Sequence, residues 1–362
     1  MPLQYAEKIN PARRERQRNR MTIAESPYGL HRVIGQPHTL PQPADRLDAS
    51  LPCGDTEIEV AVEHLHIDAS SLRQLRNEYG GDLEAARRAL LTLVQQRGKL
   101  HNRITNSGGI LTGQVRKVGS AHPSPPQVGM RIATLVSLTL TPLRLDALGE
   151  IDRESNSVEA RGTAYLFERS PWAEIPADIP ESVVLAAFDV AGAPARVRAR
   201  TRPGMRVLVV GAGNSGSLAA VAAAEAGASE VIVADLSERR VRRLESLGIP
   251  ALKTVIADAS NAVEFVSRVG APADLTVSCV DRPSVEMACI LATRSDGHVL
   301  FFSMTTDFTR AALGAEGVGS GVTLEIGNGF YPGHAERAVD LLKRHPTLWY
   351  LLVPENVGEG RA

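Results

Sequence analysis

The chain has 362 residues, of which 43% are hydrophobic and 22% charged, and its formal net charge is −1. This length favours two domains, because single cores rarely grow beyond about 250–300 residues, and the near-zero charge gives no field that would favour nucleic acid or a membrane surface as partner. Three widely spaced cysteines exclude a disulfide framework, and the lack of an apolar run long enough to span a bilayer predicts a cytoplasmic protein.

The first 20 residues are expected to form a basic tail, because five arginines fall between residues 12 and 20 without an interleaved aromatic. Alternating apolar and polar residues then predict strands at 57–67, 108–120 and 130–145. Between the first two, residues 81–99 have helical periodicity, with Asp82 as the N-cap and Gly98 at the end. Residues 21–185 are therefore predicted to form an irregular β-barrel domain that carries the substrate site.

The pattern changes in residues 186–332, which are predicted to form a dinucleotide-binding domain. A fully apolar strand, a glycine turn, an alanine-rich helix and a second apolar strand occupy residues 206–237. Further strands are expected at 252–257, 274–280, 298–304 and 322–329. Apolar strands that alternate with helices indicate an α/β, doubly wound parallel sheet. The remaining residues, 333–362, include an amphipathic helix that is expected to pack back onto the first domain.

The glycine turn has the spacing GxGxxG between a strand and a helix, and an acidic residue, Asp235, ends the next strand. Its first glycine permits the turn, the second lets the backbone approach a pyrophosphate, and the third lets helix and strand pack closely. Asp235 suits the ribose hydroxyls of NAD, although the arginine side chain at position 240 leaves NADP open. The motif's position after a β domain argues against a flavin, and the six-strand spacing argues against adenosylmethionine. The predicted cofactor-binding residues are Gly211, Gly213, Asn214, Ser215, Gly216, Asp235, Arg240 and Val280.

A β domain followed by a nucleotide-binding domain is the order of the medium-chain dehydrogenase/reductase superfamily, whose first domain is GroES-like. More specifically, this sequence resembles the L-erythro-3,5-diaminohexanoate dehydrogenase family from about residue 26 to 350. The stretches that carry the resemblance are 26–48, 66–75, 106–119, 132–145 and 188–195. It implies NAD(P)-dependent oxidative deamination of L-erythro-3,5-diaminohexanoate to 5-amino-3-oxohexanoate and ammonia, as in lysine fermentation. The hydride would leave the amine-bearing C3, and a homodimer would be usual for the superfamily.

Zinc-dependent relatives in the superfamily carry metal-binding cysteines at two positions and a His-Glu pair at a third. This sequence has Asp68 and Asp189 at the cysteine positions and Gly109 with Ile110 in place of the pair, so no metal is predicted. A carboxylate suits an ammonium or iminium, because it stabilises positive charge where that charge develops. Asp68 and Asp189 are therefore predicted to be catalytic, together with Ser70, which matches the position of a hydroxyl relay.

Arg32, His66 and Glu325 are the predicted substrate-binding residues, with Arg32 suited to the substrate carboxylate. Structural roles stay open for the same side chains: Asp68 as a helix N-cap, Asp189 as a cap of the helix that follows it, Arg32 in an ion pair and His66 in the core. Alternative functions also stay open. They are a dehydrogenase of another diamino acid in secondary metabolism, a zinc-free quinone or enone reductase, and a cofactor-binding protein without catalysis.

Overall fold

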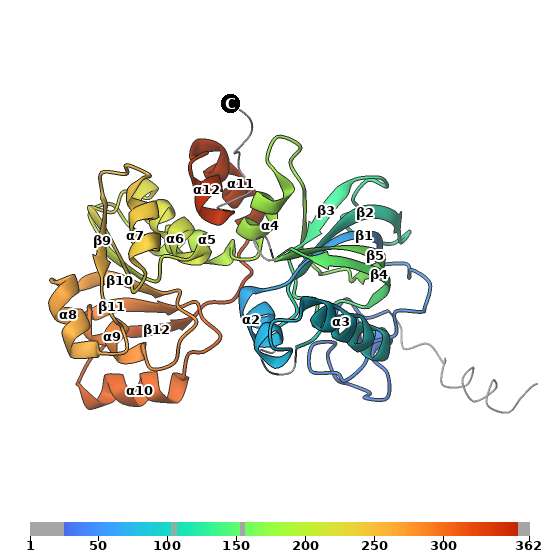
Figure 1. Ribbon diagram of the computed structural model, residues 1–362, viewed down its shortest axis with the longest axis horizontal. Helices are drawn as coiled ribbons and strands as arrows, with labels where there is room; N and C mark the ends of the chain where they lie inside the picture. The colour runs from blue at the N-terminus through green and yellow to red at the C-terminus, as the bar shows by residue number, and fades with distance from the viewer. Residues whose placement is uncertain (1–24, 103, 105–106, 153–155, 354–362) are drawn as a thin grey trace, which may run out of the picture.

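The computed structural model describes residues 25–102, 104, 107–152 and 156–353; the predicted basic tail lies outside these residues. Two six-stranded sheets form the framework, one antiparallel and built from the first half of the chain, the other parallel and built from the second half (Figure 1). The predicted fold class, an α/β protein with a β domain followed by a doubly wound parallel sheet, is confirmed.

The antiparallel sheet has the strand order β4-β5-β1-β2-β3-β6. Its strands are β1 (Ile58–His66), β2 (Ile110–Val118), β3 (Arg131–Thr134), β4 (Leu143–Ile151), β5 (Ser157–Leu166) and β6 (Trp172–Glu174). The alternation in β1 buries Ile58, Val60 and Val62, and a bulge between Val62 and His64 then shifts the register. The predicted strand at 130–145 is two strands, because an irregular segment separates β3 from β4.

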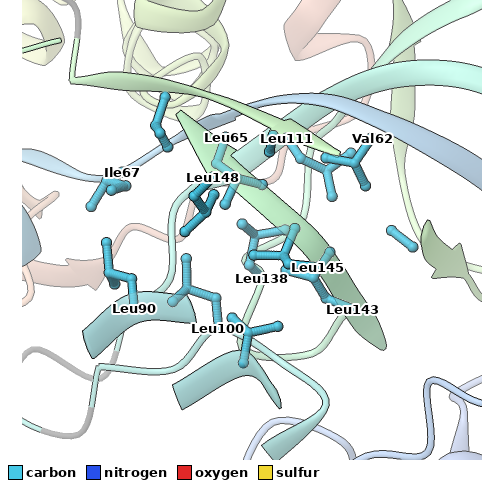
Figure 2. Packing of buried hydrophobic residues seen from close by; sticks show 14 of the residues in the cluster. Val62, Leu65, Ile67, Leu90, Leu100, Leu111, Leu138, Leu143, Leu145 and Leu148 are labelled. Atoms are coloured by element: carbon cyan, nitrogen blue, oxygen red, sulfur yellow. The ribbon is translucent and has the colours of Figure 1, made fainter. Parts of the chain in front are cut away.

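Within the described residues of the first domain, the 3-10 turn η1 (Leu30–Arg32) precedes β1, and two helices follow it. Helix α2 (Ala69–Glu78) begins directly behind Asp68, and α3 (Leu83–Arg97) is capped by Asp82 and ends at Gly98, as predicted. Leucine and valine side chains of α3 pack under the antiparallel sheet (Figure 2). Burial of this apolar face stabilises the domain that positions the end of β1.

The parallel sheet has the order β12-β11-β10-β7-β8-β9, which is the 3-2-1-4-5-6 order of dinucleotide-binding folds when numbered from β7. Its strands are β7 (Arg206–Val210), β8 (Glu230–Asp235), β9 (Leu252–Ile256), β10 (Ala273–Ser278), β11 (Thr293–Phe301) and β12 (Thr323–Ile326). The helices that connect them are α6 (Asn214–Glu225), α7 (Glu238–Glu245), α8 (Ala262–Val269), α9 (Glu286–Leu291) and α10 (Phe308–Gly317). All six strands predicted for this half of the chain are present.

Four helices lie where the two sheets meet: α4 (Glu181–Phe188), α5 (Gly192–Arg200), α11 (His334–Arg344) and α12 (Leu348–Leu352). A buried apolar cluster joins α4, α11 and α12 to Ile110 and Ala173 of the antiparallel sheet and to Leu218 of α6. The predicted boundary after residue 185 falls within α4. None of the helices in the described part of the chain is both long and apolar enough to cross a lipid bilayer.

Candidate active site

The glycine loop joins β7 to α6 at the carboxyl end of the parallel sheet. Gly211 has φ +105°, and a Cβ added there would lie 2.7 Å from Val280 Cγ1, so the loop packs directly against the segment that follows β10. A Cβ at Gly216 would lie 1.7 Å from the Gly211 carbonyl oxygen, whereas one at Gly213 would meet no atom within 4 Å. The tight turn and the open space at Gly213 fit the approach of a dinucleotide pyrophosphate to the N-terminus of α6.

Asp235 ends β8 beside this loop and is 7% exposed. Its carboxylate accepts hydrogen bonds from the backbone N–H groups of Ala212 and Ser237, both at 2.7 Å. These two bonds hold the acid at the strand end where a dinucleotide ribose binds in this fold. Arg240 lies in α7 with its Nη1 3.8 Å from Asp235 Oδ2, so the predicted cofactor residues converge on one edge of the sheet.

A second group of side chains gathers where β1 ends. His66 is 4% exposed in β1, and its Nδ1 has no hydrogen-bond partner among the residues described. Asp68 follows two residues later as the N-cap of α2, where Oδ1 accepts a hydrogen bond from the Ser71 N–H at 2.8 Å. The helix-cap role considered for Asp68 is therefore real. It occupies one carboxylate oxygen and leaves the acid at the first turn of α2.

Asp189 joins this group from the C-terminal end of α4. Burial raises the pKa of its carboxyl, His66 acts in the opposite direction, and Asp68 raises the pKa further. Asp189 is thus close enough to His66 and Asp68 to interact with both electrostatically, although it follows Asp68 by 121 residues in the chain. Asp189 does not cap α5, whose N-cap is Ala191 without a side-chain hydrogen bond. A buried carboxylate with a raised pKa is a better proton acceptor than an ordinary carboxylate.

Comparison with known proteins places this arrangement in a family. A family model described as the L-erythro-3,5-diaminohexanoate dehydrogenase N-terminal domain matches residues 31–176. L-erythro-3,5-diaminohexanoate dehydrogenase from Fusobacterium nucleatum subsp. nucleatum is 39% identical over 330 residues, which cover 89% of this chain and 96% of that protein. The enzyme of the same name from Acetoanaerobium sticklandii is also 39% identical, over 87% of this chain and 94% of that protein.

The chain belongs to the L-erythro-3,5-diaminohexanoate dehydrogenase family. It is an oxidoreductase with a nicotinamide cofactor, and the resemblance inferred from the sequence is confirmed. Among solved structures, the alcohol dehydrogenase of Aeropyrum pernix matches with a TM-score of 0.53 and 15% identity over 87% of this chain and 88% of that chain. The alcohol dehydrogenase TADH from Thermus sp. ATN1 matches with a TM-score of 0.52 and 17% identity over 84% and 87%. These structures show the fold that the dehydrogenase shares.

Gly109, which the sequence places where zinc-dependent relatives carry their His-Glu pair, leaves no room for a side chain. Gly109 has φ +72°, and a Cβ there would lie 1.9 Å from the His66 carbonyl oxygen and 3.1 Å from the Ile67 Cα. A ligating side chain therefore does not fit at this position on this backbone. Within the described ranges, no three histidine, cysteine, aspartate or glutamate side chains are grouped so as to hold a metal ion. The donor set of a catalytic zinc, which needs three protein ligands, does not fit these residues.

The prediction that Arg32 binds the substrate carboxylate does not agree with its environment. Arg32 is 1% exposed, and its guanidinium forms an ion pair with Glu57 and stacks 3.9 Å from the centre of the Tyr165 ring. It also donates to the carbonyl oxygens of Asp48, Leu51 and Pro52. The guanidinium is saturated inside the first domain, so Arg32 has a structural role; it forms an ion pair, but a buried one and not the surface pair considered from the sequence.

Glu325 also forms ion pairs within the protein. It accepts hydrogen bonds from Arg196 at 3.1 Å, from Arg200 at 2.9 Å and from His298 at 2.6 Å. These partners tie β12 to α5 and β11, and the described contacts place no cofactor or active-site residue beside Glu325. Its predicted role in substrate binding has no support from this geometry. Ser70 lies in the first turn of α2. Its side chain is not among those that the structure describes, so its catalytic role stays a prediction.

Two charged residues near the site had no signal in the sequence. Arg73 of α2 forms an ion pair with Asp281, one residue beyond Val280, and so joins the two domains. Arg73 is one of 40 basic residues in the chain, and no motif distinguishes it. The pairing depends on how the domains face each other, which spacing along the chain does not encode.

Proposed function

We propose that the protein catalyses the oxidative deamination of L-erythro-3,5-diaminohexanoate to 5-amino-3-oxohexanoate and ammonia. The observation that carries the proposal is the 39% identity to dehydrogenases named for this substrate, over 96% of the length of one of them. The two neighbouring acids, Asp68 and Asp189, support it, because an amine substrate needs groups that accept a proton and tolerate a cation. A quinone or enone would need an apolar pocket, which this pair of acids does not provide.

The protein's own residues would act on the substrate in a defined order. Asp189, with its raised pKa, would accept the proton that the C3 ammonium must lose before it becomes a hydride donor. The bound nicotinamide supplies the hydride acceptor. Asp68 would stabilise the iminium that forms at C3. Water then adds to that carbon, and ammonia leaves to give the ketone. His66, buried in β1, would lower the pKa of Asp189 and so oppose the effects of burial and of Asp68.

The reaction is proposed to proceed without zinc. The closed backbone at Gly109 and the acids at positions 68 and 189 support this, because they replace the donors that a catalytic zinc requires. NAD is the proposed cofactor in preference to NADP. The buried Asp235 would accept hydrogen bonds from the ribose hydroxyls and would repel a 2′-phosphate. We also propose that the protein is cytoplasmic and forms a homodimer. Light scattering tests the dimer: a mass of two chains is expected, and a mass of one chain would contradict it.

One assay tests the substrate, the cofactor and the metal together. Formation of NADH or NADPH is followed with 3,5-diaminohexanoate and with a panel of simple amines, amino alcohols and quinones, with and without a chelator. The expected result is turnover of the diamino acid with NAD that the chelator does not change. Absence of turnover with any amine would overturn the proposed function, whereas loss of activity in chelator would overturn only its zinc-free form.

A further inference from the structure

A cavity lies between α2 and the carboxyl ends of two strands of the parallel sheet. Arg73 and Asn77 line it from α2, and Asp281, Met304 and Thr305 line it from the segments that follow β10 and β11. Arg73 Nη2 is 3.4 Å from Asp281 Oδ2 across this cavity, with side chains 60% and 40% exposed. The cavity therefore contains a solvent-accessible pair of opposite charges, one from each domain.

The pair is connected through the chain to both halves of the candidate active site. Asp281 directly follows Val280, whose side chain packs against Gly211 of the cofactor loop. Arg73 is the fifth residue of the helix that Asp68 caps, which places it about 7–8 Å farther along the helix axis. Arg73 and Asp68 are thus carried by the same helix and its N-cap. The carboxyl ends of the strands are also the side of the sheet where nicotinamide cofactors bind.

The substrate assigned under the proposed function carries two charges besides the reacting amine: a carboxylate at C1 and a second ammonium at C5. Arg32 is saturated by Glu57 and backbone carbonyls, so it does not serve the carboxylate. Arg73 is the one cation among the described residues that line the cavity. Exposed ion pairs contribute little to stability, so the Arg73–Asp281 pair opens at small cost.

We propose that this pair is a receptor for a zwitterionic substrate, in which Arg73 binds the C1 carboxylate and Asp281 binds the C5 ammonium. The inference rests on the proposed function for the identity of the substrate. It assigns the selectivity for β-amino acids that carry a second, distal amine to two residues on opposite domains. A planar guanidinium matches a carboxylate with two parallel hydrogen bonds, and substrate binding exchanges one ion pair for two.

Binding of unreactive ligands to the full-length protein with NAD tests the assignment without relying on turnover. The ligands are 5-aminohexanoate, which lacks the C3 amine, its C1 amide, and hexanoate, and affinities are measured by calorimetry. Arg73→Gln is expected to weaken the binding of 5-aminohexanoate by about 10- to 100-fold, as for the loss of a hydrogen bond to a charged group. It should leave the affinity for the amide unchanged. Asp281→Asn should weaken the binding of 5-aminohexanoate but not that of hexanoate, which has no ammonium group.

Arg76→Gln is the matched control, because Arg76 is an exposed arginine of the same helix that does not line this cavity. It should leave all three affinities as in the wild type. If Arg73→Gln weakened the binding of 5-aminohexanoate and of its amide equally, the Arg73–Asp281 pair would only hold the two domains together, and the assignment would be overturned. Unchanged affinity for 5-aminohexanoate would overturn it as well. Failure of the proposed function has a different signature, since the wild type would then not oxidise 3,5-diaminohexanoate at all.

Discussion

Asp68 combines a structural contact with a proposed chemical role, and one substitution separates the two. Asparagine caps helices about as well as aspartate, so Asp68→Asn should keep the hydrogen bond to the Ser71 N–H. The amide carries no charge to stabilise an iminium, and we expect turnover to fall by about 10²- to 10⁴-fold, the range for a lost acid–base or electrostatic group. Steady-state kinetics and thermal melts measure the two effects.

Asp82→Asn is the control for this substitution, because Asp82 caps α3 with the same kind of hydrogen bonds on a helix that carries none of the predicted site residues. It should change neither activity nor melting temperature. Near-normal turnover in Asp68→Asn would mean that the charge is supplied by another residue. A large loss of stability together with activity would instead leave the cap as its main role.

Asp189 gives the site a pH dependence. Burial raises the pKa of its carboxyl, so the rising limb of kcat/KM should lie above the ordinary carboxyl range, and Asp189→Asn should remove that limb with most of the activity. Since the folded pKa exceeds the unfolded one, folding favours the protonated form, and stability from this group is lost as the pH rises through the folded pKa. Asp189→Asn should therefore melt at a higher temperature than the wild type at neutral pH.

The difference in melting temperature between Asp189→Asn and the wild type should shrink as the pH falls below the ordinary carboxyl range. Melts over a pH series and the pH profile of the wild type check both effects. An activity limb in the ordinary carboxyl range, or a variant that is less stable at neutral pH, would contradict the assignment of a buried, high-pKa acid.

At this scale the sequence predicted the side chains whose positions a family pattern defines. Asp68 and Asp189 were singled out because the resemblance puts them where zinc-dependent relatives carry metal ligands, and the structure brings the two acids near each other. Arg32 and Glu325 were misjudged for a physical reason: whether a charged side chain faces substrate or an internal partner depends on residues brought near it by folding. Glu57 and Arg200 are those partners here, and both are remote from any motif.

At the scale of elements, the glycine loop offers a test of cofactor binding that spares the fold. A Cβ at Gly213 meets no atom within 4 Å, so Gly213→Ala should fold normally. It should still weaken NAD binding by at least about tenfold, because the backbone there must approach the pyrophosphate closely. Fluorescence titration with NADH measures the affinity. Gly317→Ala in α10, equally free of neighbours, should bind NADH as the wild type does; equal affinity in both variants would contradict the predicted approach.

The segment before β1 is held by the buried Arg32–Glu57 ion pair. Burial raises the pKa of Glu57, but hydrogen bonds from Arg32 and His31 outweigh it and hold that pKa at about 2. A lowered folded pKa means that the pair stabilises the fold above the unfolded pKa and that this stability is lost as the pH falls toward about 2. Removing one partner strands a buried charge, so Glu57→Gln should lower the free energy of unfolding by about 3–5 kcal/mol.

Glu84→Gln is the exposed counterpart, since Glu84 pairs with Arg87 and Arg88 on the surface of α3. Its effect on the free energy of unfolding should be small, as for exposed pairs on helix surfaces. Urea denaturation of both variants gives the comparison. A similar small loss for Glu57→Gln would mean that water or a rearranged segment replaces the lost carboxylate.

Most elements could be predicted because their periodicity and end signals agree, as in α3 with Asp82 at one end and Gly98 at the other. The division between β3 and β4 could not. The irregular segment between them has the same apolar alternation as a strand. Its Leu138 is fully buried although it lies outside any strand. Periodicity reports burial, and a loop packed into a core gives the same signal as a strand.

At the scale of the molecule, the order of the parallel strands follows from the βαβ rules, but the joint between domains does not. The buried cluster that fills this joint takes side chains from the antiparallel sheet, from α4, from α6 and from the helices near the C-terminus. These segments are distant in the chain, and their pairing is a consequence of tertiary packing. A shared core predicts that the two sheets lose their structure together when the protein unfolds.

Leu342→Ala tests this coupling. Leu342 of α11 is 0% exposed within the shared cluster, and its truncation should lower the free energy of unfolding by about 2–5 kcal/mol, as for other buried leucines. Unfolding should remain a single transition, with equal calorimetric and van't Hoff enthalpies, because the cavity weakens both domains at once. Leu313→Ala in α10, where the side chain is 61% exposed, should change little. Two separate transitions, one of them insensitive to Leu342→Ala, would show that the domains fold independently and that the cluster only docks them.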